Sequence, residues 1–440
     1  MLHRRILKLT PEALWVFIGQ VGIAIAGLVG IKLLTHILDP SEFGRLALAN
    51  TIVALIVTSS FGPFAQGLMR FWAISRDRGN LKEFYTVSRH LAKYISFVVF
   101  LITVMVSALI IWIARKFDWT ILVILSLAIG IVIGNFNLML SVFKAARQRR
   151  RVAILNNSNA FLRPMIATLV VILIIAKANI ALLGYLLASL FIFLVTKRVY
   201  SQMVSESYLP HSKPKSQELP FESLGKKILS YSLPFLIWGI FGWIHMSCDR
   251  WSLQTFYGSE VVGAFAVVSL LSTYPLIFGS GFLSSLFTPI AFQKGGDLSQ
   301  SHKIASANKI LMVMTGIYII GAVVLIGFFA IFHQSLVLLI SNISFIRYSH
   351  LLPWLTLAWA FFFLGQMFST FGMLANQPQI YIMPKLVSSV VAVSATFYLS
   401  FRIGPIGVVW GLLLAGFIYA LWCGIIVLRL VGKEREPLFL

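Results

Sequence analysis

The amino-acid sequence predicts an all-α polytopic membrane protein with about 12 transmembrane helices, and two observations lead to this prediction. First, 59% of the 440 residues are hydrophobic and only 11% are charged, whereas soluble domains carry roughly 25% charged residues. Second, the apolar residues fall into long runs, and a membrane-spanning helix needs about 20 mostly apolar residues. Lipid-exposed strands would leave backbone groups unpaired, so each run is expected to be helical.

Twelve apolar runs are long enough to cross a bilayer. They lie at residues 12–38, 43–69, 90–114, 117–143, 152–176, 179–200, 228–257, 260–290, 308–332, 351–374, 379–401 and 406–430.

The formal net charge of +22 would indicate a nucleic-acid partner in a soluble protein. Here, however, most of the 36 basic residues lie in every second loop, which is the pattern of the positive-inside rule if the N-terminus is cytoplasmic. The sequence therefore predicts a multi-pass protein with both termini in the cytoplasm and no nucleic-acid partner.

The longest polar segment, residues 201–227, contains prolines and lies at the middle of the chain. This composition is typical of a linker. We therefore expect an N-terminal six-helix lobe at 1–200, a cytoplasmic linker at 201–227 and a C-terminal six-helix lobe at 228–440.

A weak internal repeat supports two lobes. Gly44 and Gly263 are separated by 219 positions, and Ala47 and Ala266 follow at the same offset. One interpretation is that two short helical hairpins share common turn residues. The other is a duplicated lobe, as in transporters whose halves rock about a central site.

Four cations, Lys32, Arg163, Arg250 and Lys385, lie inside the predicted spans and belong to neither set of loops. A charge there costs about 2.5–3.5 kcal/mol at the membrane centre. Lys32 and Arg250 lie at similar depths in the first and seventh spans, and Arg163 lies in the fifth. Arg250 could extend toward the interface or pair with Asp249. Alternatively, Lys32 and Arg250 could face a shared cavity. This excess of cations favours an anionic substrate group such as a diphosphate, because arginine holds phosphate oxygens with paired hydrogen bonds.

Asn156, Asn159 and Arg163 are spaced i, i+3 and i+7, so they form one polar stripe on a helix. A polar stripe that ends in an arginine is unfavourable against lipid. We therefore expect it to face a hydrated cavity.

No motif indicates an enzyme. The histidines are scattered, the two cysteines Cys248 and Cys423 lie in separate apolar runs, and no glycine-rich phosphate loop is present in the sequence. We expect no metal site, no cofactor and no catalytic residue.

Two segments resemble a known family. Residues 34–44 (LTHILDPSEFG) and residues 247–265, which begin SCDRW and include YG and VGAF, are similar to bacterial polysaccharide (O-antigen type) flippases. These proteins belong to the multidrug/oligosaccharidyl-lipid/polysaccharide exporter (MOP) superfamily.

The resemblance implies a MATE-like, V-shaped transporter of the bacterial inner membrane. It implies alternating access that carries a polyprenyl-diphosphate-linked oligosaccharide from the cytoplasmic to the periplasmic leaflet for cell-surface polysaccharides such as lipopolysaccharide O-antigen. By analogy, Lys32, Arg163 and Arg250 would attract the diphosphate, and Asn156 and Asn159 would meet the sugars. Asp249 would be the candidate for ion coupling.

Expected partners are the lipid-linked oligosaccharide, membrane lipids, a polysaccharide polymerase and glycosyltransferases. Two alternatives remain open at this point. One is an exporter of small amphipathic or cationic compounds. The other is a scaffold of a polysaccharide assembly complex that transports nothing.

Overall fold

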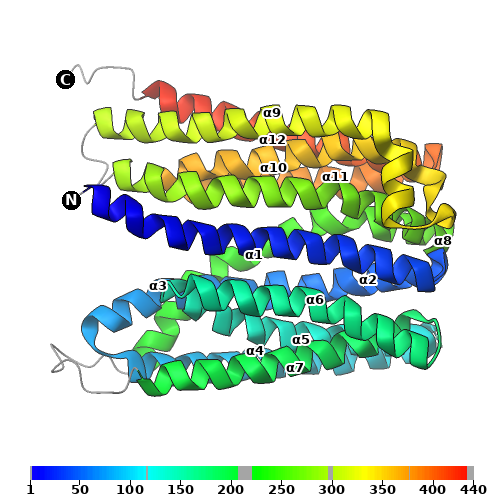
Figure 1. The fold of residues 1–440 in the computed structure, drawn as a ribbon, viewed down its shortest axis with the longest axis horizontal. Helices are drawn as coiled ribbons and strands as arrows, with labels where there is room; N and C mark the ends of the chain where they lie inside the picture. Colours follow the sequence, from blue (N-terminus) through cyan, green and yellow to red (C-terminus); the bar gives the residue numbers. More distant parts are fainter. Residues whose placement is uncertain (1, 115–116, 207–220, 296–300, 376, 434–440) are drawn as a thin grey trace. The chain divides into compact units, whose positions relative to one another are not determined.

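The computed structural model describes residues 2–114, 117–206, 221–295, 301–375 and 377–433, and every regular element within them is a helix (Figure 1). The predicted all-α class is confirmed. The elements are α1 (Leu2–Ile37), α2 (Pro40–Leu55), the π-helix η1 (Ile56–Phe61), α3 (Gly62–Arg78), α4 (Leu81–Ala114), α5 (Phe117–Ala145), α6 (Arg149–Leu173), α7 (Ala178–Glu206), α8 (Phe221–Gly295), α9 (Ser301–Ile340), the 3-10 helix η2 (Ile343–Leu351), α10 (Leu352–Leu374), the 3-10 helix η3 (Pro378–Tyr381), α11 (Ile382–Ile403) and α12 (Pro405–Lys433).

The helices overlap all twelve predicted spans, and their ends differ from the predicted ends by up to about ten residues. Ten segments of the described chain are long and apolar enough to cross a membrane. One of them, in α8, contains two predicted spans, because the helix is interrupted only at Gly258, which has φ 80° and ψ 178°. The remaining predicted span is α6, whose polar stripe lowers its hydropathy below that of the other spans.

Contacts between α-carbons group the chain into two compact units. The first unit contains residues 1–44 and 244–440, and the second contains residues 45–243. The lobes predicted at 1–200 and 228–440 remain a prediction. At the predicted linker 201–227, residues 201–206 belong to α7 and residues 221–227 to α8, while residues 207–220 lie outside the described part of the chain.

The second unit is built around α5, which packs against α3, α4 and α7. Its core contains the fully buried rings of Phe61, Phe84 and Phe143. The ring of Phe61 lies where the side chain of residue 134 would otherwise stand, and Gly134 leaves that space open. The π-helix η1, which includes Phe61, continues directly into α3. Large rings facing small residues therefore allow these helices to approach closely.

In the first unit, α12 packs along both α10 and α11. Small residues line these crossings. The ring of Tyr419 lies against Gly365, and Gly411 lies against the backbone of α11 at Thr396. Such small-residue contacts replace the hydrophobic effect as the source of helix association in lipid, where close packing and van der Waals contact dominate.

The turns between consecutive helices contain residues that commonly cap the start or the end of a helix. Asp39 accepts a hydrogen bond from the backbone N–H of Glu42 at 2.8 Å, which caps the start of α2. Gly404 has φ 82° and ends α11, and Pro405 then begins α12. These turn signals are visible in the sequence and mark where one helix ends and the next begins.

The two repeated glycines contact each other's segments. A Cβ at Gly44 would overlap the carbonyl oxygen of Ser259, and a Cβ at Gly263 would overlap the carbonyl oxygen of Pro40. Each glycine thus allows the backbone of one repeat to touch the backbone of the other, and the contact is reciprocal. A close crossing of two helices at facing glycines gives such a reciprocal contact, and a duplicated lobe stays a prediction.

The glycine contact leads to a stability prediction. Gly263→Ala should lower the thermal unfolding midpoint of the purified protein, because the new methyl group must push a backbone carbonyl aside and overpacking costs about 1–3 kcal/mol. The matched control is Gly279→Ala in the same helix, where a Cβ meets nothing within 4 Å. That variant should be neutral or slightly stabilising. Equal midpoints for the two variants would contradict the glycine contact.

Candidate functional site

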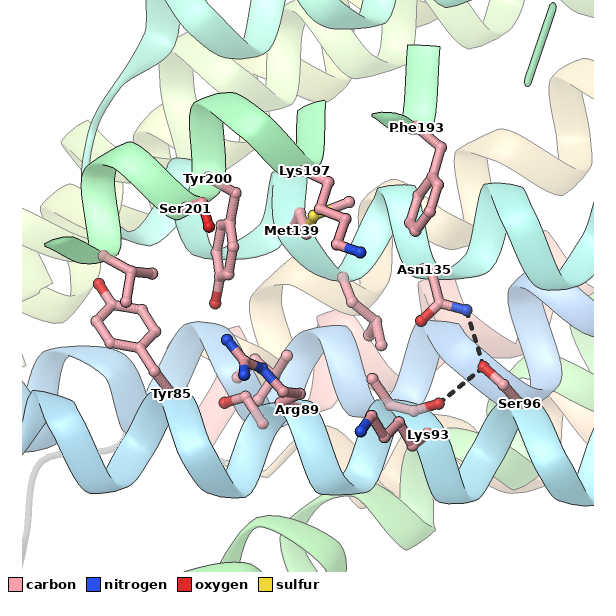
Figure 2. A pocket seen from close by; sticks show the side chains of 15 residues that line it. Tyr85, Arg89, Lys93, Ser96, Asn135, Met139, Phe193, Lys197, Tyr200 and Ser201 are labelled. Carbon is pink, nitrogen blue, oxygen red and sulfur yellow. Dashed lines mark hydrogen bonds between the residues drawn. The ribbon is translucent and has the colours of Figure 1, made fainter. Parts of the chain in front are cut away.

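The second unit contains a cavity of about 590 Å³ between α4, α5 and α7 (Figure 2). Fifteen residues line it. Most of the lining is apolar or aromatic, and polar side chains come from each of the three helices. A partly apolar cavity of this size with a few convergent polar groups is typical of a ligand-binding site.

Three cations border this cavity. Arg89 and Lys93 project from α4 and Lys197 projects from α7, on the opposite side of the hollow (Figure 2). All three side chains are exposed. None of the described residues that line the cavity is acidic. Mutual repulsion between the cations is therefore not relieved within the lining, and an anionic ligand group would relieve it.

Another part of the lining is neutral and polar. The side-chain amide of Asn135 donates hydrogen bonds to Ser96 Oγ at 2.8 Å and to the carbonyl oxygen of Ile131 at 2.9 Å. Ser96 in turn donates to the carbonyl oxygen of Ala92 at 2.8 Å. These bonds fix the orientation of Asn135. The cavity therefore combines cations with pre-oriented neutral polar groups, which suits a ligand with both an anionic and a hydroxyl-rich part.

Aromatic rings border the same cavity. The rings of Tyr85 and Tyr200 pack edge to face with centroids 5.9 Å apart, and Phe193 lies on the same helix as Tyr200. The hydroxyl of Tyr85 accepts a hydrogen bond from Trp72 Nε1 at 3.3 Å. Rings held in this way provide rigid amphipathic surface at little entropic cost.

Sequence reasoning missed this cavity because it assigned Arg89, Lys93 and Lys197 to membrane topology. A signal was nevertheless present. Tyr85, Arg89 and Lys93 are spaced by four residues, and this spacing places them on one face of a helix. What the sequence could not show is that α7 presents Lys197 to the same face.

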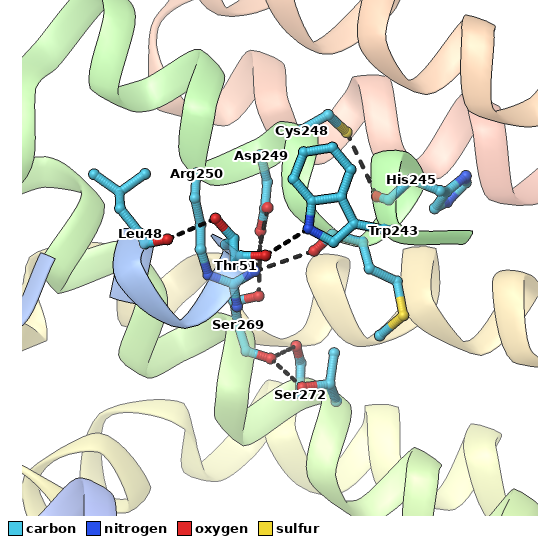
Figure 3. A network of polar contacts seen from close by, with 11 residues as sticks. Leu48, Thr51, Trp243, His245, Cys248, Asp249, Arg250, Ser269 and Ser272 are labelled. Carbon is cyan, nitrogen blue, oxygen red and sulfur yellow. Dashed lines mark hydrogen bonds and ion pairs between the residues drawn. The ribbon is translucent and has the colours of Figure 1, made fainter. Parts of the chain in front are cut away.

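Asp249 and Arg250 form an ion pair in the first unit (Figure 3). Asp249 is completely buried, and its carboxylate lies 3.4 Å from Arg250 Nη1 and accepts a hydrogen bond from Ser269 at 3.4 Å. The guanidinium also donates to the carbonyl oxygen of Met246 at 3.1 Å. Of outward extension and pairing, the structure shows pairing, because the side chain bends back along its own helix. A cavity shared with Lys32 stays a prediction.

The predicted stripe on α6 lies in the second unit. Asn156, Asn159 and Arg163 are all partly buried. The guanidinium carbon of Arg163 lies 4.5 Å from the ring centroid of Tyr185 in α7. This geometry is a cation–π contact, which is stronger where water is excluded. It gives Arg163 a partner inside the bundle, and a hydrated cavity next to the stripe remains a prediction.

Lys32 has an exposed side chain in α1 of the first unit. Its carbonyl oxygen accepts a hydrogen bond from His36 Nδ1 at 2.8 Å. Of the six predicted site residues, the structure therefore brings Asp249 and Arg250 into contact and aligns Asn156, Asn159 and Arg163 along one helix. A common site formed by all six stays a prediction.

Among the described residues, no group of three or more histidine, cysteine, aspartate or glutamate side chains is placed to hold a metal ion. The two cysteines are buried as free thiols.

Comparison with family models decides the family. The model described as "Polysaccharide biosynthesis protein" matches residues 9–293, which is more than half of the chain. The chain belongs to the polysaccharide biosynthesis protein family. A search of curated proteins finds no match.

This polysaccharide biosynthesis protein has the fold of MOP superfamily transporters. An outward-facing multidrug resistance MATE family transporter aligns with a TM-score of 0.66 at 16% identity over 95% of each chain. The eukaryotic MATE transporter AtDTX14 aligns with 0.65 at 14% identity over 98% of each chain. A MOP superfamily transporter from Pyrococcus furiosus, described as having a binding pocket of reverse polarity, aligns with 0.63 at 15% identity over 95% of each chain. At these identities the likeness shows the fold alone.

The buried ion pair leads to a second stability prediction. Asp249→Asn should destabilise the polysaccharide biosynthesis protein by about 3 kcal/mol, because it leaves the mostly buried guanidinium of Arg250 without its counter-charge. Combining Asp249→Leu with Arg250→Met should recover most of the loss, since both charges then disappear together. Thermal unfolding of the purified variants measures both effects.

The control is Asp77→Asn. Asp77 also pairs with the adjacent arginine, Arg76, at 2.9 Å, but both side chains are more than half exposed. Water and salt screen such a pair, so its loss should change the midpoint little. Equal destabilisation by Asp77→Asn and Asp249→Asn would contradict a special role for burial.

Proposed function

We propose that the protein is a flippase that moves a polyprenyl-diphosphate-linked oligosaccharide from the cytoplasmic to the periplasmic leaflet of a bacterial inner membrane. The single observation that carries this proposal is the cavity bordered by Arg89, Lys93 and Lys197 with no acidic residue in its described lining. Membership of the polysaccharide biosynthesis family and the MOP transporter fold support it.

The chemistry of the cavity matches the head of such a substrate. A diphosphate offers several anionic oxygens, and arginine and lysine are the side chains that bind them best. Neutral groups such as Asn135 and Ser96, together with Tyr200, supply hydrogen bonds and ring faces for sugars. The polyprenyl chain would remain in lipid. The positive-inside pattern places Arg89, Lys93 and Lys197 toward the cytoplasm, the side from which the substrate would enter.

In this proposal the three cations hold the diphosphate while the sugars cross. Lys32, Arg163 and Arg250 remain proposed as further contacts along the path, and Asn156 and Asn159 as sugar contacts. A polysaccharide polymerase and glycosyltransferases would act before and after the transfer across the membrane. Alternating access is the expected mode of movement, because it never opens a continuous pore for charged sugars.

An exporter of small cationic compounds is the competing function. Such a substrate would require acidic or purely aromatic lining, because a cation near three uncompensated cations is repelled. The described lining of the cavity therefore disfavours it. A non-transporting scaffold would leave the charge of the cavity without a role.

The proposal predicts a specific loss of transport. Arg89→Gln and Lys197→Gln should each reduce translocation about tenfold or more, because a charge-assisted hydrogen bond contributes about 1.5–3 kcal/mol. The measurement uses a bacterial strain that lacks its own flippase, with quantification of lipid-linked sugar in each leaflet and of surface polysaccharide. Lys197→Arg should retain most of the transport because the charge remains.

The matched control is Lys82→Gln, an exposed lysine of α4 that does not line the cavity. It should leave translocation unchanged. Full complementation by the Arg89→Gln, Lys93→Gln, Lys197→Gln triple variant would exclude the cavity as the diphosphate site. Resistance to a cationic drug on expression, without complementation, would support the exporter instead.

A further inference from the structure

A lysine is buried in an aromatic cage in the first unit, far along the chain from the cavity described above. Lys385 belongs to the first turn of α11, and its side chain is only 1% exposed. Its Nζ lies 4.0 Å from the ring centroid of Phe362 in α10 and 5.0 Å from that of Tyr419 in α12. Neither the topology of the chain nor the proposed transport path accounts for a lysine at this position.

The site is unfavourable for a permanent positive charge. A full charge buried within a bundle in the membrane is costly. The N-terminal end of a helix adds to that cost, because the helix dipole places partial positive charge there. Lys385 is both buried and close to a helix start. Attraction to the aromatic ring faces offsets only part of this cost.

A histidine shares the same phenyl ring. His245 in α8 is 1% exposed, and its ring stacks on Phe362 with centroids 4.3 Å apart and an interplanar angle of 28°. Its Nδ1 lies 3.1 Å from Ser388 Oγ, and Ser388 donates its hydroxyl proton to the carbonyl oxygen of Ala415 at 3.1 Å. A hydroxyl has only one proton, so Nδ1 carries a hydrogen and donates to Ser388.

The other titratable groups that face Lys385 carry no positive charge. They are Tyr381, which directly precedes α11, and Tyr419 and Cys423 of α12. The helix α10 contributes uncharged rings, and α8 contributes His245. Two neighbouring cations cannot both be accommodated in so dry a region, so only one of Lys385 and His245 can be charged at a time.

We propose that Lys385 is a proton-binding site whose occupancy controls the packing of α10, α11 and α12. In the neutral form, the amine fills the cage between Phe362 and Tyr419. Uptake of one proton from water turns it into an ammonium, which draws the long side chain toward the nearby start of α11 and loosens the contacts of that helix. Release of the proton to water restores the packing.

Hydrogen–deuterium exchange of the purified full chain tests this inference without any substrate. Exchange in peptides from α10, α11 and α12 is measured between about pH 6 and 9 and corrected for the chemical dependence of exchange on pH. We expect lower protection at the acidic end in the unmodified protein. Lys385→Met should abolish that difference, because its side chain has similar length and cannot take up a proton. Lys309→Met, at an exposed lysine of α9, should retain it.

A second variant separates the two protonatable groups. His245→Gln should retain the pH-dependent difference, since the proton resides on Lys385. Lys385→Arg, which stays cationic at every pH, should show the lower protection throughout the range.

Three outcomes would overturn the inference. They are exchange that does not vary with pH in the unmodified protein, a difference that survives in Lys385→Met, and a difference that disappears only in His245→Gln. The proposed flippase activity is not measured in this experiment. Failure of the flippase proposal would therefore show as full complementation by the cavity variants and not as a changed exchange pattern.

Discussion

The cost of placing cations within an apolar bundle is the constraint on which the rest of this structure depends. Three buried or partly buried cations each lie against groups of the protein. Arg250 meets a carboxylate and a backbone carbonyl, Arg163 lies over a tyrosine ring, and Lys385 lies between a phenylalanine and a tyrosine. The cations of the cavity differ from these, because they remain exposed beside a lining with no described acid. The contrast separates charges that lie against groups of the protein from charges that border an open cavity.

Close approach of helices makes these arrangements possible. Gly365 admits the ring of Tyr419, which is one wall of the cage around Lys385. In the second unit, Gly134 admits the ring of Phe61 into the core beside α5, the helix that also carries Asn135 of the cavity. Small residues in one helix therefore determine where large and polar residues of the next helix can stand.

The all-α fold and the order of its spans could be predicted from the sequence, because the length of apolar runs and the capping residues depend on local chemistry. Leu38, Gly258 and Gly404 all mark helix ends or interruptions that the pattern of apolar runs indicated. The candidate site was harder to predict from the sequence. Arg89 and Lys197 are 108 positions apart, and only the packing of α4 and α7 around α5 brings them to one cavity.

The sequence alone could not show the surroundings of Arg250 and Lys385 either, because those surroundings depend on how the helices pack. The sequence allowed both an outward-reaching and a paired Arg250, and the choice depends on a rotamer that follows from packing. Lys385 stood out in the sequence only as a charge within a span, because its aromatic neighbours come from two other helices.

The reciprocal approach of Gly44 and Gly263 has a consequence for how the two halves of the sequence can diverge. At each position, an added side chain would meet the main chain of the opposite repeat and not its side chain. Main-chain atoms are the same for every amino acid, so no change at one glycine can make room for a larger residue at the other. The two positions are therefore restricted independently, and each should tolerate replacement poorly whatever residue stands at the other.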